Sequence, residues 1–178
     1  MTFRQRAIGA AKLDIAVFEE IEADRSATRQ ALAVVVISSA AAGVGLSTSV
    51  YDAPVLTRVI LALLLWLFWA ALTYAIGLYL LPEPQTETNL GELLRTIGFA
   101  ASPGTLRVFG SIPVIGPTVY GAATVWMLVA MIIAIRQALD YKSTARAVVV
   151  CLIAWVIAVA MAALMGGLLF LVAEEVFS

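Results

Sequence analysis

Long apolar stretches separated by short polar segments dominate the chain. A helix needs about 20 apolar residues to cross the hydrocarbon core of a bilayer. Four stretches of roughly this length contain no charged residue: 31–50, 59–81, 118–135 and 147–173. The pattern predicts an all-α, polytopic membrane helix bundle over 31–178, preceded by a separate N-terminal segment over 1–30.

A fifth stretch, 92–113, is apolar on balance but contains two arginines and a Pro-Gly pair. An arginine at the centre of a membrane helix costs about 3 kcal/mol on insertion scales, whereas a leucine gains about 0.5 kcal/mol. Arg95 and Arg107 lie near the two ends of the stretch, where long side chains can reach the headgroups. Pro103 and Gly104 are expected to break the helix, which is tolerated at membrane depth only against protein or a wet cavity. We therefore predict a third membrane helix broken at Pro103-Gly104 and shielded by the other four.

The break would free the carbonyls of Phe99 and Ala100 from helical hydrogen bonds. Arg107 carries five donors and follows the break by about one helical turn. We predict that Arg107, or a trapped water, satisfies these carbonyls and that Arg95 faces the cytoplasmic headgroups, so that replacing Arg107 has the larger effect on stability. The alternative is that Arg95 and Arg107 line a cavity at the break.

Basic residues support a count of five spans. Five Lys or Arg residues lie in 1–30 and three lie in 136–146, and the positive-inside rule places both groups on the cytoplasmic side. Two segments on one side of a membrane are separated by an even number of crossings, which requires the disputed stretch to cross as well. The sequence therefore predicts a cytoplasmic N-terminus, an outside C-terminus, and spans at about 31–50, 59–81, 92–113, 118–135 and 147–173.

The N-terminal segment has the periodicity of an amphipathic helix over residues 3–30. Its apolar residues share one side on a 3.6-residue period, although charged residues intrude: Phe3, Ile8, Ala11, Ile15, Phe18 and Ile21. Two interpretations remain, a solvated cytoplasmic helix and a helix that lies at the membrane interface. We favour the interface.

Small residues recur at four-residue spacing within two of the spans. In the first span they form the pairs Ser39 with Gly43 and Ala41 with Gly45, and in the last span they form a packing ridge of Ala154, Ala158, Ala162 and Gly166. Such residues allow helix backbones to approach closely in lipid. We interpret them as packing within the chain, and a homodimer face is the alternative.

Composition restricts the chemistry. The chain is 62% hydrophobic and 13% charged, compared with about half and about a quarter in soluble domains. A net charge of −1 gives no indication of a nucleic-acid partner. The absence of histidine excludes imidazole bases and histidine metal sites, and the single cysteine, Cys151, excludes an intrachain disulfide and CxxC sites. We expect no enzymatic activity, no cofactor and no metal. Charge-free spans also argue against an ion-coupled transporter.

Three features between Glu92 and Ala147 occur in an informative order: ELLRTIGFAASPG before the break, IPVIGP before the span that contains Trp126, and AIRQALDYKSTARA before the last span. Together they resemble the Yip family of membrane proteins, named for Ypt-interacting proteins. The opening VFEEIEADRSATRQAL resembles that of bacterial members. The resemblance covers nearly the whole chain and rests on order and spacing.

The resemblance implies a five-span fold with a cytoplasmic N-terminus and no catalytic residues. In eukaryotic members it implies contact with Rab-type GTPases. This alanine-rich, lysine-poor chain is expected in a bacterial inner membrane, without such a GTPase partner. We expect membrane organisation or scaffolding, with the lipid bilayer, a second copy or other membrane proteins as partners. The alternative is a passive transporter or channel for a small solute or lipid. A deep polar cavity at Pro103-Gly104 would favour the conduit, and a packed bundle would favour the scaffold.

Overall fold

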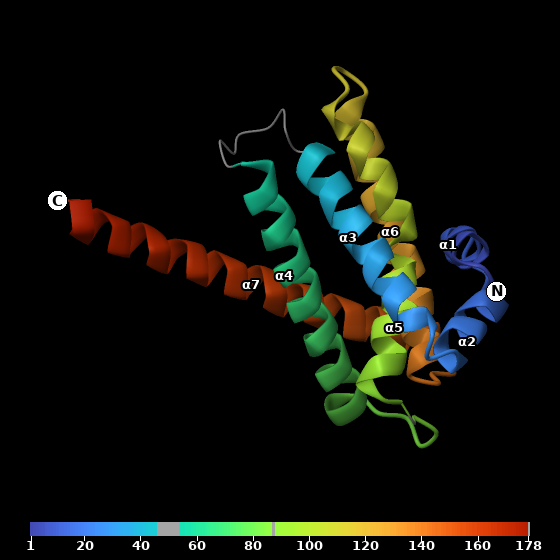
Figure 1. Ribbon diagram of the computed structural model, residues 1–178. Helices are drawn as coiled ribbons and strands as arrows, with labels where there is room; N and C mark the ends of the chain where they lie inside the picture. Colours follow the sequence, from blue (N-terminus) through green and yellow to red (C-terminus); the bar gives the residue numbers. More distant parts are fainter. Residues whose placement is uncertain (46–53, 87, 178) are drawn as a thin grey trace.

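The protein folds as an assembly of helices (Figure 1), seen in a computed structural model. The structure describes the backbone of residues 1–45, 54–86 and 88–177, and their side chains except at 162 and 165–177. The elements, in chain order, are α1 (Phe3–Ala11), α2 (Ile15–Ala23), α3 (Ala27–Gly45), α4 (Val55–Ala75), the π-helix η1 (Ile76–Leu80), α5 (Leu90–Ala100), the 3-10 helix η2 (Ser102–Ser111), α6 (Gly116–Ala138) and α7 (Thr144–Phe177). No strand occurs among these described residues, as the hydropathy pattern predicts.

Four helices are long and apolar enough to cross a membrane: Ala27–Gly45, Val55–Leu80, Gly116–Ala138 and Thr144–Met161. They correspond to the four charge-free stretches, so the chain has the helices of a membrane protein. The first begins four residues earlier than expected, at Ala27. Asp24, which directly follows α2, sets this start, because its carboxylate accepts hydrogen bonds from the Ser26 backbone and hydroxyl at 2.8 Å each, and this Asx turn leads directly into α3.

The segment from α5 through η2 runs along the bundle between α3 and α6, and packs against both (Figure 1). It begins near the loop after η1 and ends at the turn before α6, at the opposite end of these helices. Eleven α-helical and ten 3-10 residues extend about 36 Å at about 1.5 and 2.0 Å per residue. The segment is therefore as long as a bilayer core, which is about 30 Å thick.

The last helix is attached to the bundle by one face near its start. Ala147, Val150, Cys151 and Ala154 are buried, at a spacing of three to four residues, against α4 and α6. Beyond this contact α7 crosses α4 steeply and extends away from the other helices (Figure 1). Leu152 and Trp155, on its other side, are 55% and 51% exposed.

The N-terminal segment is a helical hairpin, and the prediction of a single amphipathic helix was wrong. Leu13 adopts a left-handed conformation with φ 65°, and the Asp14 carboxylate caps α2 by accepting from the Ala16 backbone at 3.1 Å. The chain thereby reverses between α1 and α2. Phe18 and Ile21 are fully buried as a result. The periodicity was real, but an N-cap residue in its middle divided it between two helices.

Candidate functional site

Pro103 and Gly104, where a break was predicted, lie in the first turn of η2 just after α5, buried between helices. α5 ends at Ala100 and the 3-10 helix begins at Ser102, with Pro103 at its second position. A proline is tolerated in the first turn of a helix, because the donor that it lacks has no helical partner there. The Ser102 hydroxyl donates to the Phe99 carbonyl at 2.6 Å. The Ser102 side chain therefore satisfies the Phe99 carbonyl from within the same segment.

Gly104 is the point of closest packing at this break. A Cβ atom added there would collide with the Ser38 hydroxyl and would lie 2.8 Å from the Met127 sulfur. A side chain at this position would therefore displace the Ser38 hydroxyl and the Met127 thioether, because η2 approaches both α3 and α6 here. Gly45 fulfils the same need at the end of α3, where an added Cβ would collide with the Arg107 carbonyl. Of the first-span residues predicted to allow close packing, Gly45 therefore does so within this chain.

Arg107 joins η2 to α3. Its Nε donates to the Gly104 carbonyl at 3.1 Å, and its Nη2 donates to the carbonyl and hydroxyl of Ser38 at 3.2 and 2.8 Å. The guanidinium carbon lies 5.9 Å from the centre of the Tyr120 ring, within cation–π range. Within the described residues no carboxylate forms an ion pair with it. A neutral hydrogen-bond shell thus holds this charge.

The prediction that Arg107 donates to the carbonyls of Phe99 and Ala100 was wrong. The side chain does donate to backbone carbonyls, but they belong to Gly104 and Ser38 rather than to Phe99 and Ala100. The cause is the 3-10 geometry, in which residues three apart lie above one another, so that Arg107 reaches the carbonyl of Gly104.

Arg95 does not face the headgroups, as was expected, but is buried beneath α2. It is only 5% exposed, and its Nε and Nη2 donate to the carbonyls of Ile21 and Glu22 at 3.3 and 2.6 Å. These carbonyls belong to the last turn of α2, whose final carbonyls have no helical donors. Arg95 therefore fastens the N-terminal hairpin to α5.

A third buried arginine, Arg6, was not recognised from the sequence. It is 2% exposed and donates to both carboxylate oxygens of Glu20 at 2.9 and 2.7 Å, to Gln30 at 2.9 Å, and to Asp24. The guanidinium lowers the pKa of Glu20. Hydrogen bonds from Ser26 and from Arg6 lower that of Asp24 to about 2. The alternating charges of residues 4–24 were the only signal, and they do not identify the pairs.

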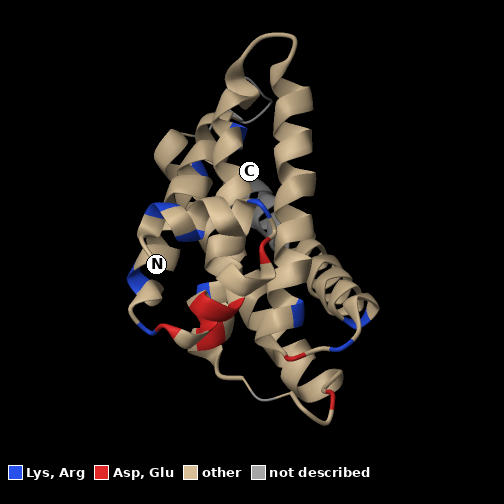
Figure 2. Ribbon diagram, turned by 90° about the vertical axis from the view of Figure 1, so that its right-hand side faces the viewer, with Lys and Arg blue, Asp and Glu red and all other residues tan. Residues whose placement is uncertain are grey.

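The pKa of Glu22, in contrast to those of Glu20 and Asp24, is raised. Burial, and then repulsion by Asp140 and Glu92, raise it to about 7, while Arg95 lowers it by a smaller amount. Figure 2 shows α2 carrying a dense group of acidic residues at the lower end of the bundle. The charged form of Glu22 is therefore unfavourable in the folded protein near neutral pH.

The loops after η1 and after α6 are joined to one another. The Tyr141 hydroxyl lies 3.0 Å from the Gly77 carbonyl and 2.8 Å from the Leu81 carbonyl. Because Leu81 donates to Ile76 across the π-turn, Gly77 is free to accept from Tyr141. Glu83 accepts from the Lys142 backbone at 3.1 Å. This connection, which the sequence did not suggest, joins the loop after α6 to the π-helix that follows α4.

The packing ridge of α7 is described only in part. Ala154 is fully buried and Ala158 is partly buried against the core, whereas Ala162 and Gly166 lie outside the residues whose side chains are described. The described portion of the ridge faces the chain itself. Over the part of the chain that the structure describes, no three His, Cys, Asp or Glu residues are grouped as a metal site would require.

Comparisons of the chain with protein-family models, with curated proteins and with solved structures find no match.

Arg95→Met should destabilise the protein. The change keeps an apolar stem but removes both donors to the last turn of α2, and a hydrogen bond to a charged group contributes about 1.5–3 kcal/mol. We expect the free energy of unfolding in detergent to fall by about 2–3 kcal/mol. Arg29→Met, at an exposed position, is the matched control and should change it by less than about 0.5 kcal/mol. Equal melting of Arg95→Met and the unaltered protein would show that α2 does not depend on this contact.

Glu22→Gln should stabilise the protein in a pH-dependent way. The folded pKa of about 7 lies above the ordinary 4.5, so the folded state binds the proton more tightly and loses stability as pH rises between these values. Thermal melts should show a higher midpoint for Glu22→Gln at about pH 8, and the difference should shrink toward about pH 5. A difference that stays constant with pH would contradict the assigned burial of the charge.

Proposed function

We propose that the chain is a Yip-like, multi-pass protein of the bacterial inner membrane that organises the membrane through contacts between helices. In this proposal the protein has no enzymatic activity, and its partners are the lipid bilayer, a second copy or other membrane proteins. The proposal draws on the motif order between Glu92 and Ala147 and on the four apolar helices. The observation that carries it is the closed packing at the helix break.

A conduit would need open space where the predicted third span changes direction. Pro103 and Gly104 are both buried, and a Cβ at Gly104 would already collide with Ser38 and approach the Met127 sulfur to 2.8 Å. Arg107 is directed at Ser38 and Gly104, so its donors are used within the bundle. This geometry favours a packed scaffold over a passage for solute at the break.

The arrangement of the helices supports a crossing by the segment from α5 through η2. In this proposal the segment from α5 through η2 is the third crossing, since it is about 36 Å long and runs between α3 and α6. The hairpin and the loop after α6 then share the cytoplasmic side. The Gln137 amide, near the end of α6, donates to Glu19 of α2 at 3.3 Å, which supports this pairing of ends.

The outer surface offers large apolar side chains to lipid or to another membrane helix. On α7 the residues Leu152, Trp155 and Val156 are 51–57% exposed, and on α4 Leu56 and Leu64 are 70% and 57% exposed. Lipid alone is as apolar as these side chains, so partner choice depends on close packing. We place the partner surface on the exposed face of α7, opposite Ala154.

Reporter fusions in a bacterial host test the orientation. Fusions after Leu81 and after Asp140 should give cytoplasmic signals, and a fusion at Ser178 should give an outside signal, because five crossings separate the two ends. A fusion after Ile115, in the turn before α6, provides an outside reference. A cytoplasmic signal at Ser178 would mean that the chain crosses the membrane an even number of times, and would contradict the proposed topology.

Photo-crosslinking in intact membranes tests the scaffold. A photoreactive residue at Leu152 or Trp155 should form adducts with a second copy or another membrane protein, and the same residue at the buried Ala154 should form only intrachain adducts. Vesicles containing the purified chain should retain an entrapped small solute. The opposite result is solute release at a rate that scales with protein content, with no protein adduct at either exposed site. It would contradict the scaffold proposal and favour a passive conduit.

A further inference from the structure

The turn between η2 and α6 presents an apolar surface at one end of the bundle. Figure 1 shows this turn as the yellow loop at the upper end of the view. Its largest side chains are exposed, together with the phenylalanine near the end of η2: Phe109 is 48% exposed, Ile112 41%, Val114 94% and Ile115 54%. We call these four residues the apolar tip. No charged residue occurs from 108 to 135, so the tip lies within an uncharged stretch of chain.

Val114 has a backbone conformation that its own side chain makes unfavourable. Its φ is 70°, in the left-handed region that glycine and asparagine tolerate and that a β-branched residue rarely adopts. The Ile115 backbone donates to the Pro113 carbonyl at 2.9 Å, which makes a γ-turn of the rare, strained form. Because the Val114 side chain is 94% exposed, contacts within the chain do not offset this strain. Strain of this kind clusters at sites of contact with ligands, which indicates that the side chain is used outside the chain.

The backbone of the turn has few donors that need water. Two of the six residues 112–117 are prolines, which have no backbone N–H. Three of the other four donate to nearby carbonyls: Ile112 to Phe109 at 3.1 Å, Ile115 to Pro113 at 2.9 Å, and Gly116 to Ile112 at 2.9 Å. The hydrocarbon core excludes irregular backbone that faces lipid. A turn that satisfies most of its own donors therefore fits the boundary between acyl chains and headgroups.

The apolar tip continues the side of α6 that faces outward. Thr118, Ala122, Val125 and Val129 are exposed at spacings of three to four residues, and residues at these spacings share one side of a helix. α6 is long and apolar enough to cross a membrane, and in a membrane this side contacts lipid. Since no charged residue separates it from the tip, the lipid-facing surface extends without interruption onto the turn.

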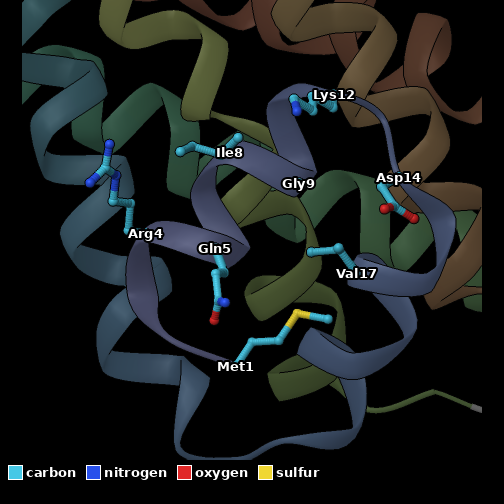
Figure 3. Close-up of a pocket in the computed structure, with 8 residues that line it drawn as sticks. All are labelled: Met1, Arg4, Gln5, Ile8, Gly9, Lys12, Asp14 and Val17. Carbon is cyan, nitrogen blue, oxygen red and sulfur yellow. The ribbon is translucent and has the colours of Figure 1, made fainter.

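The N-terminal hairpin shows how differently this chain builds a surface that faces water. Figure 2 shows the acidic residues of α2 at the lower end of the bundle, whereas the turn at the upper end has the colour of uncharged residues. A surface pocket of about 440 Å³ between α1 and α2 is lined in part by Arg4, Gln5, Lys12 and Asp14 (Figure 3). Water can solvate these side chains, but the apolar tip offers it no charged group.

We propose that the apolar tip inserts into the boundary between headgroups and acyl chains of the leaflet at its end of the bundle. The partner is a lipid surface, and Val114 is the side chain that enters it furthest. Burial of apolar side chains at this boundary is favourable in proportion to the area removed from water, which offsets the strained γ-turn. The inference rests on the membrane placement proposed above. It adds that the connection between the third and fourth crossings stays in contact with lipid.

Spin labels on the purified full-length chain in phosphatidylcholine vesicles test the insertion. Each label is attached to one introduced cysteine after the buried Cys151 is replaced by alanine. The measurement is the collision rate of the label with oxygen, which dissolves in lipid, and with a polar nickel chelate, which is equilibrated on both sides of the bilayer. Val114→Cys reports on the tip. Val125→Cys, 61% exposed in the middle of α6, is the lipid reference, and Ser143→Cys, in the exposed turn before α7, is the water reference.

We expect the chelate to collide with the Val114 label at least about five-fold less often than with the Ser143 label, because a polar molecule that enters apolar surroundings loses at least about 1 kcal/mol. Oxygen collisions at Val114 should lie between those at Ser143 and at Val125. Ile115→Cys, on the same tip, should give the same result. It replaces Val114→Cys if that variant melts at a lower temperature than the unaltered chain.

Two results would overturn the proposal. Chelate collisions at Val114 equal to those at Ser143 would place the tip in water. Rare collisions with both reagents would show that a second copy of the chain covers the tip. The Val125 label separates either failure from a failure of the proposed function: a lipid-like signal at Val125 leaves the membrane placement intact, whereas a water-like signal there would contradict both proposals.

Discussion

Burying a guanidinium without hydrogen-bond partners is unfavourable, and the positions of three arginines in this structure reflect that constraint. Burial of an unpaired charge is far more unfavourable than the loss of an ordinary contact. Arg6, Arg95 and Arg107 each meet the constraint by donating to other elements: Arg6 to α2 and α3, Arg95 to α2, and Arg107 to α3. Each arginine thereby adds directional hydrogen bonds between helices that otherwise contact one another through hydrophobic packing.

The three arginines differ in the partners that satisfy them. Arg6 is paired with the carboxylates of Glu20 and Asp24, whose side chains are 29% and 35% exposed. Arg107 is held by a hydroxyl, by carbonyls and by an aromatic face. Neutral partners suit an apolar position, because a single buried charge requires donors and acceptors but a second buried charge would add its own desolvation cost. Arg6 therefore pairs with partly exposed carboxylates, whereas the more apolar surroundings of Arg107 supply neutral acceptors.

Helix positions could be predicted from the sequence because hydropathy is a local property. The four apolar stretches depend on runs of residues that are adjacent in the chain. The partners of Arg95 and Arg107 depend instead on which helices touch, and Arg95 bonds to carbonyls 73 and 74 positions away. Asp14 shows an intermediate case. Its capping chemistry is visible in the sequence, but an apolar periodicity that continues past it concealed the reversal of the hairpin.

The attachment of the N-terminal hairpin has a consequence for biosynthesis. The ribosome makes α1 and α2 first, yet the groups that hold them are supplied by α5 and α6: Arg95 donates to Glu22, and Trp126 donates to Ala11 across 115 positions. Until those later segments emerge, the hairpin has only its internal contacts and those with α3, such as Arg6 with Gln30. The hairpin of α1 and α2 therefore docks only after α5 and α6 have been made, although it is made before them.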